Sequence, residues 1–198
     1  MKFKTNGSKE AAALRFFIKF NLFAIPLYVL AAINFDFLLA QRAVAGIEMW
    51  LLQAAGIGAS IEGLLITVPV QGGSWGGFIN SDCIGWKSML AYAALVLATD
   101  FSSRKKLTGM LLLPIIFLAN IARVFFMFFY VNTWGLAGYG FVHAVVWSWG
   151  LLLIVAVTWI IWAKWLPETN IYHRKANSQY DSRGQAKRDR GAAQQAGK

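Results

Sequence analysis

Long apolar stretches are the feature that most constrains the fold of this sequence. They occupy roughly residues 16–33, 84–101, 107–131 and 141–165. A helix needs about 20 such residues to cross the hydrocarbon core of a bilayer. Of all residues, 58% are hydrophobic and 14% are charged, whereas about a quarter of a soluble domain is charged. We therefore expect an all-α polytopic membrane protein with about four transmembrane helices.

The first apolar stretch fits two interpretations. It follows the basic residues Lys2, Lys4, Lys9, Arg15 and Lys19, and both signal peptides and uncleaved membrane anchors begin in this way. Because Lys19 intrudes on the boundary of the apolar part and no polar mature segment follows, we favour an uncleaved anchor.

Two segments between the first and second spans differ from the spans. In residues 37–55 the apolar side chains recur on one helix face, and Gln41, Arg42 and Glu48 lie elsewhere, which predicts an amphipathic helix at the interface or on the bundle. Residues 56–85 are rich in glycine, which predicts a short extracytoplasmic β-hairpin. Unpaired backbone is not tolerated in lipid, so this second segment should lie outside the hydrocarbon or line a protein cavity.

The distribution of basic residues indicates the orientation. They concentrate in residues 1–19, 102–106 and 164–198, and cytoplasmic loops are enriched in Lys and Arg. Segment 34–82 has one basic residue against four acidic ones, and segment 132–140 has no charge. We therefore expect both termini in the cytoplasm and these last two segments outside.

The net charge of +10 does not require a nucleic-acid partner. Topology and contact with anionic membrane lipids account for the basic residues. We expect an integral membrane domain over residues 1–166 and a basic, disordered cytoplasmic tail over residues 167–198.

Two polar residues interrupt the third apolar stretch. Asn120 and Arg123 are three positions apart and share one helix face. A central arginine costs roughly 2.5–3.5 kcal/mol in a spanning helix and usually faces the protein interior or a wet cavity. The pair is either a contact between helices or part of a functional site, and we favour the site.

Cys83 is the single cysteine of the chain and opens the second span. One cysteine excludes an internal disulfide and any multi-cysteine metal site, and nothing calls for another metal or an organic cofactor. By itself it fits a small buried apolar residue as well as a reactive thiol. Thiolates are favoured at helix N-termini beside cations. We expect Ser81 or Asp82 to cap this helix, with Cys83 in its first turn and Lys87 one turn later.

His143 opens the fourth span at its outer end. In the predicted topology Cys83, Arg123 and His143 all lie in the outer leaflet, on three different helices. If these helices pack together, a nucleophile, an acid or base, and a cation that can stabilise an oxyanion meet in one place.

The segments Asp82-Cys-Ile-Gly-Trp-Lys-Ser88, Asn120-Ile-Ala-Arg123 and His143, in this order on successive spans, form a series. This series resembles the signature of the exosortase/archaeosortase family of membrane transpeptidases, and the likeness covers roughly residues 20–165. The chain is short for that family, which leaves the subfamily open.

The resemblance implies the chemistry and the substrates. Cys83 would be the nucleophile, Arg123 the substrate-binding or transition-state residue, and His143 the acid and base. The substrates would be exported, membrane-anchored proteins whose C-terminal sorting signal has a short motif, a transmembrane helix and a basic cluster. A thioester intermediate would pass to a lipid or another envelope acceptor at the plasma membrane of a prokaryote. The supporting residues would be Asn120, Lys87 and Asp82.

Three further hypotheses concern function. The glycine-rich segment 63–82 is suited to bind an extended peptide by strand addition. The main alternative to an enzyme is a small transport or assembly protein in which Asn120, Arg123 and His143 line a polar path. The Gly-x-Ser-x-Gly pattern at 72–76 fits a serine hydrolase only in residue types, because no α/β helix is expected to follow it.

Overall fold

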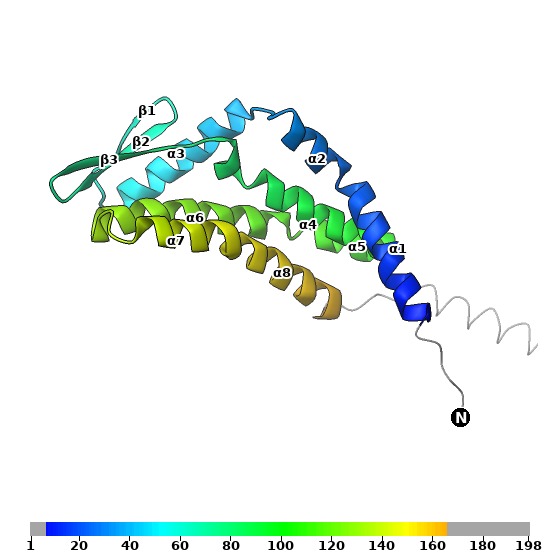
Figure 1. The fold of residues 1–198 in the computed structure, drawn as a ribbon. Coiled ribbons are helices and arrows are strands. Elements are labelled where there is room, and N and C mark those ends of the chain that lie inside the picture. The colour runs from blue at the N-terminus through cyan, green and yellow to red at the C-terminus, as the bar shows by residue number, and fades with distance from the viewer. Residues whose placement is uncertain (1–6, 166–198) are drawn as a thin grey trace, which may run out of the picture. The chain divides into compact units, whose positions relative to one another are not determined.

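Helices form most of the structure, a computed structural model that describes residues 7–165 (Figure 1). The predicted tail at 167–198 and the basic residues Lys2 and Lys4 lie outside the described residues. In chain order the helices are α1 (Gly7–Phe23), α2 (Ile25–Ala32), α3 (Leu38–Ala54), the 3-10 turn η1 (Ser81–Ile84), α4 (Trp86–Ala98), α5 (Ser103–Met110), α6 (Leu113–Trp134), α7 (Tyr139–Val145), the π-helical turn η2 (Val146–Gly150) and α8 (Leu151–Trp165).

One helical stretch of the described residues is by itself long and apolar enough to cross a membrane. It runs over Ser103–Trp134, includes α5 and α6, and extends beyond the predicted span 107–131 at both ends. The pair α1 and α2 reaches this length only when both helices are taken together, and α4 and α8 are shorter apolar helices. The number of four spans therefore stays a prediction.

Local sequence explains where several helices begin and bend. Pro26 and Pro114 lie in the first turns of α2 and α6. Proline lacks a backbone N–H, but the N–H groups of a first turn make no hydrogen bond within the helix, so none is lost there. The axes of α1 and α2 meet at 42°. The fourth apolar stretch, predicted as a span over 141–165, is helical but not one regular α-helix, because the π-helical turn η2 lies between α7 and α8. Such π turns are frequent at functional sites.

A small antiparallel sheet follows α3, with three strands where the sequence predicts a hairpin. Its central strand β2 packs on α6 and buries Ile66 and Val68. A side chain at Gly77 would bring its Cβ within 2.8 Å of the Phe128 ring, so glycine allows the last strand to lie against α6. The strands, in the order β1-β2-β3, are β1 (Ser60–Glu62), β2 (Leu65–Val70) and β3 (Gly73–Phe78).

The sheet and the basic segments lie at opposite ends of α6 (Figure 1). At the end near the sheet, Asn132 Nδ2 donates to the Pro69 carbonyl at 2.8 Å. At the other end, Lys19 pairs with Asp100 after α4, and Lys105 Nζ donates to the Ala163 carbonyl near the end of α8 at 3.1 Å. The structure thus gathers the described basic segments at one end.

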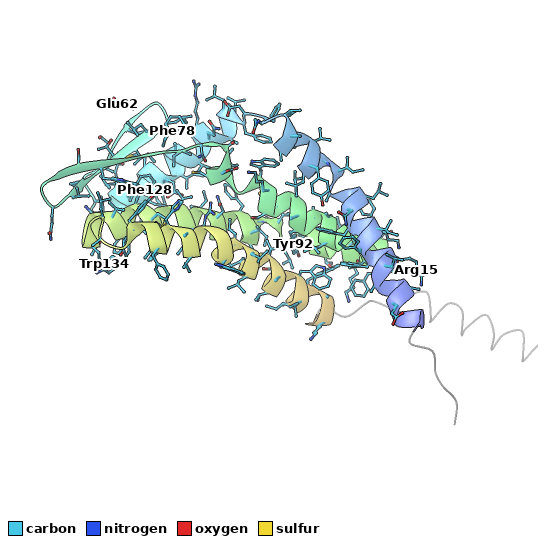
Figure 2. The ribbon with its side chains drawn as sticks, viewed as in Figure 1. Arg15, Glu62, Phe78, Tyr92, Phe128 and Trp134 are labelled. Atoms are coloured by element: carbon cyan, nitrogen blue, oxygen red, sulfur yellow. The ribbon has the colours of Figure 1, made fainter. Side chains whose placement is uncertain are left out.

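Two apolar cores hold the helices together. One lies around η1, between α3, the sheet and α6, and includes Cys83. The other lies between α4, α6 and α8, where the fully buried Tyr92 donates its hydroxyl to the Gly109 carbonyl at 3.1 Å (Figure 2). Large apolar side chains such as Leu118 of α6 and Leu153 of α8 are exposed, as contact with lipid would require.

Candidate active site

Asn80 shapes the turn that carries Cys83. Its side-chain Oδ1 accepts hydrogen bonds from the backbone N–H groups of Asp82 at 3.0 Å and Cys83 at 3.2 Å. The thiol of Cys83 also points at this oxygen, at 3.4 Å. The predicted cap at Ser81 or Asp82 is therefore wrong. Asn80, a favoured capping residue, caps the 3-10 turn, and Cys83 precedes α4 instead of lying in its first turn.

Asn120 on α6 fixes the other side of this turn. Its Nδ2 donates to the carbonyl of Cys83 at 2.6 Å, and the Asn120 side chain is fully buried. Gly85 makes this contact possible, because a Cβ there would lie 2.7 Å from Asn120 Cγ. Gly85 also has a left-handed backbone with φ 78°, which glycine adopts readily. The backbone of the cysteine is thus held from both sides.

Cys83, Arg123 and His143 line one cavity of about 330 Å³. Its wall also includes residues 75–80 of β3 and the following segment, together with Tyr139. Cys83 and Arg123 are each 8% exposed, so the thiol and the guanidinium are shielded from bulk solvent. The structure therefore brings together the three residues that the sequence places on different helices.

A row of aromatic rings connects His143 to the sheet. Tyr139 stacks on the His143 ring with a centroid distance of 5.5 Å. Trp75 of β3 contacts Tyr139 at 5.3 Å and Phe128 of α6 at 5.7 Å. These contacts hold α7, and therefore the imidazole, against the mouth of the cavity.

The surroundings of Cys83 have opposing effects on the pKa of its thiol. Burial raises the pKa of the thiol above its ordinary value and is the largest effect. A backbone hydrogen bond of Asn80 and the Arg123 charge lower this pKa, whereas the Asp82 carboxylate, and Glu48 when it is ionised, raise it. The net direction is upward, so the resting thiol is protonated at neutral pH, and a base has to accept its proton before attack.

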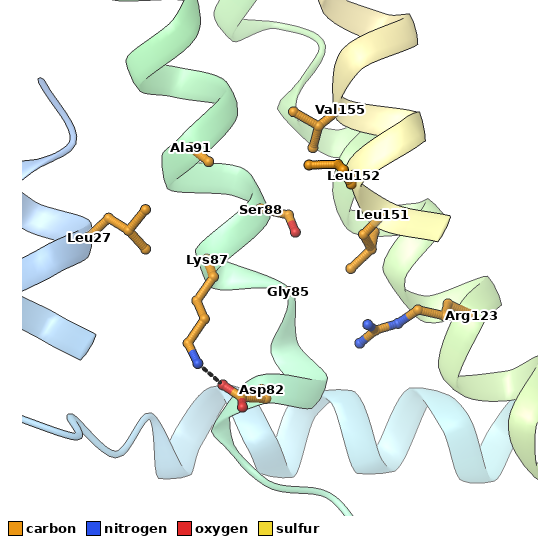
Figure 3. A pocket seen from close by; sticks show the side chains of 10 residues that line it. All are labelled: Leu27, Asp82, Gly85, Lys87, Ser88, Ala91, Arg123, Leu151, Leu152 and Val155. Atoms are coloured by element: carbon orange, nitrogen blue, oxygen red, sulfur yellow. Dashed lines mark ion pairs between the residues drawn. The ribbon is translucent and has the colours of Figure 1, made fainter. Parts of the chain in front are cut away.

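Lys87 and Asp82 pair with each other outside this cavity. Lys87 Nζ lies 2.6 Å from Asp82 Oδ1, and both side chains are partly exposed. The pair lines a second cavity of about 380 Å³, where Lys87, Asp82 and Arg123 form a polar end and leucines of α2 and α8 form apolar walls (Figure 3). The spacing of Lys87 predicts that it is the cation next to the thiol. This prediction is wrong, because Lys87 pairs with Asp82. Arg123 has that place and borders both cavities.

The model of the transmembrane exosortase family matches residues 5–163. This chain belongs to the transmembrane exosortase family. The predicted family resemblance is thereby confirmed, and the exosortase is a membrane protein. A search of curated proteins and a search of solved structures each find no match.

Sequence reasoning missed several residues that shape the site of this exosortase. Asn80 carries a readable signal, since asparagine three positions before the cysteine is a common cap. Trp75 and Tyr139 give no such signal, because their contact depends on how β3 meets α7. Glu48 is recognisable as a charge on the amphipathic segment 37–55, but the sequence does not indicate that it is buried. Among the described residues no group of three or more His, Cys, Asp or Glu side chains is placed to hold a metal.

Proposed function

We propose that this exosortase is a cysteine transpeptidase that cleaves the C-terminal sorting signals of exported, membrane-anchored proteins. The observation that carries the proposal is the shared cavity of Cys83, Arg123 and His143 in a member of the exosortase family. A thiol, a fixed cation and an imidazole are the groups that acyl transfer through a thioester requires.

In the first half of the proposed reaction, His143 accepts the thiol proton of Cys83, and the sulfur attacks the scissile carbonyl. The Arg123 guanidinium stabilises the oxyanion of the tetrahedral intermediate. His143 then gives the proton to the leaving amine, the C–N bond breaks, and the thioester remains on Cys83. The Asn120 hydrogen bond to the Cys83 carbonyl keeps the sulfur in position during these steps.

In the second half, an acceptor attacks the thioester and regenerates the thiol. A hydroxyl, an amine or water loses its proton to His143, and Cys83 leaves and regains a proton. The second cavity, beside Arg123, offers a route for an acceptor that comes from the membrane, because its walls are apolar and its inner end is polar (Figure 3). A lipid headgroup or another envelope acceptor fits this shape, and no cofactor takes part.

We infer that the substrate peptide adds to β3 as a further strand. β3 pairs with β2 on one side, and no described strand pairs with its other side. The last residues of β3 line the cavity that contains Cys83. Backbone hydrogen bonds from β3 would hold an extended peptide with little dependence on its side chains.

We further propose four membrane spans, with both termini in the cytoplasm and the active site near the extracytoplasmic face. This topology is supported by the basic segments at one end of the helices and the sheet at the other. Residues 1–166 would be the catalytic membrane domain, and residues 167–198 its basic cytoplasmic tail. A substrate anchored by its own helix would then reach Cys83 at a fixed depth.

Trapping the thioester with neutral hydroxylamine tests this proposal. Membranes of the source cells are treated with hydroxylamine during processing, and protein C-termini are read by mass spectrometry. The proposal predicts C-terminal hydroxamates with the wild-type enzyme and none with Cys83→Ser. If neither enzyme gives hydroxamates and the C-terminal helices are retained in both, the transport or assembly alternative is favoured, since such a protein has no need of the thiol.

A further inference from the structure

Glu48 of α3 is a buried carboxyl group that the proposed mechanism does not use. Its side chain is 0% exposed. Neither of its carboxylate oxygens has a hydrogen-bond partner among the described residues. Burial of an unpaired carboxylate is costly, and such groups usually become neutral instead. This position therefore requires an explanation beyond packing.

Glu48 lies on a helix that packs against the turn of the candidate nucleophile. The face of α3 that carries Val44, Ala45 and Leu52 belongs to the same apolar core as Cys83. α3 packs on η1 and on α6. The charged groups that act on the Cys83 thiol are Arg123 of α6, Asp82 of η1 and Glu48 itself, whereas Arg42, the other charge of α3, is exposed.

We propose that Glu48 is a positioning residue for Cys83 that stays protonated during catalysis, so that the thiolate is the single buried anion opposite Arg123. This inference rests on the proposed role of Cys83 as nucleophile. One guanidinium balances one anion, and a second buried anion beside the thiolate would oppose its formation.

The direction of the effect follows from the charges. Burial raises the pKa of Glu48 to about 8. Below that pH the neutral carboxyl leaves the thiol under the influence of Arg123. Above it, Glu48 gives its proton to water, and the resulting carboxylate raises the pKa of the Cys83 thiol. Glu48 therefore limits the gain in thiolate that alkaline pH would otherwise produce.

Alkylation of the single cysteine measures this effect without any substrate. The full-length protein in lipid nanodiscs is treated with iodoacetamide from about pH 6 to about pH 10, a range that covers the ordinary thiol pKa. The variant Glu48→Gln keeps the shape and removes the charge. Glu62→Gln is the matched control, because Glu62 is an exposed carboxylate on β1.

The expected result is a difference confined to alkaline pH. Glu48→Gln should react at the wild-type rate near neutral pH and up to roughly tenfold faster above pH 8, the factor that one pKa unit represents. Glu62→Gln should follow the wild type throughout. Identical profiles for the wild type and Glu48→Gln, or a slower reaction of folded Glu48→Gln at every pH, would overturn the inference.

A second measurement applies if Glu48→Gln does not fold. Infrared spectra of the wild-type protein should contain the C=O band of a protonated carboxyl at neutral pH, and this band should disappear as the pH rises past about 8. No such band at neutral pH would overturn the inference. Because neither assay needs turnover, a protein that shows both effects but processes no substrate would contradict the proposed function and leave only the effect of Glu48 on the Cys83 thiol established.

Discussion

Replacement of Gly85 by alanine should disturb Cys83 without touching it. The new Cβ would lie 2.7 Å from Asn120 Cγ and 2.9 Å from Asn120 Oδ1. The left-handed backbone costs an alanine about 1–2 kcal/mol. Displacement of Asn120 also breaks its hydrogen bond to the Cys83 carbonyl and leaves buried polar groups unpaired, at about 1–3 kcal/mol. We expect Gly85→Ala to lower the free energy of unfolding by roughly 2–5 kcal/mol, the sum of these two costs.

Gly56 provides the matched control for this change. It has a similar backbone, with φ 76°, but nothing lies within 4 Å of its Cβ position. Gly56→Ala should therefore show only the backbone cost of about 1–2 kcal/mol. A double-mutant cycle with Asn120→Ala isolates the contribution of the amide, because Gly85→Ala has no amide to displace in that background, whereas the Cβ of residue 120, at 2.9 Å, is present in both backgrounds. The expected coupling energy is about 1–3 kcal/mol.

Chemical unfolding in detergent micelles measures these free energies, and the alkylation rate of Cys83 reports on the geometry of the turn. The alkylation rate should change in Gly85→Ala and stay at the wild-type value in Gly56→Ala. Equal losses of stability in the two glycine variants, or equal costs of Gly85→Ala with and without Asn120, would refute the argument that Gly85 makes room for Asn120.

Three other predictions follow from the described contacts. Gly109→Ala should destabilise the protein by about 1–3 kcal/mol, because its Cβ would lie 2.8 Å from the Trp162 ring. Thermal unfolding measures this loss. Gly46→Ala should show no such loss, because nothing lies within 4 Å of its Cβ position. The raised pKa of Glu48 means that the folded state keeps a proton that the unfolded state releases. Stability should thus fall as pH rises from 4.5 to about 8, by up to roughly 5 kcal/mol, and pH-dependent unfolding of Glu48→Gln should lack this fall. Arg123→Lys should reduce turnover by up to ~10²-fold, because lysine lacks the planar fork; full activity in a processing assay would argue against bidentate contact with the oxyanion.

The apolar runs and the order of polar residues predicted much of this arrangement. Run length and charge indicated a helical membrane protein, and the family match confirms that class and the resemblance. The spacing of Asn120 and Arg123 predicted a shared helix face, and both are buried in α6. These features depend on local periodicity, which a single sequence contains.

The details of the site depend on contacts that periodicity does not encode. Asn80, and not Ser81 or Asp82, is the cap, because its side-chain oxygen accepts hydrogen bonds from the backbone N–H groups of the next residues. Gly85, with its left-handed backbone, then separates η1 from α4. Lys87 is close to Cys83 in sequence, yet it turns toward Asp82 because an exposed ion pair is available there. The burial of Glu48 depends on how α3 meets η1 and α6, a tertiary contact with no local signal.

The most direct test of the account compares the C-termini of surface proteins between the wild type and a Cys83→Ala strain with equal amounts of enzyme. Mass spectrometry of membranes from the source cells gives these termini. If Cys83 is the processing nucleophile, C-terminal helices are removed in the wild type and retained in the mutant, and the mass on each new terminus identifies the acceptor. Identical termini in the two strains would contradict the role of Cys83 as the processing nucleophile.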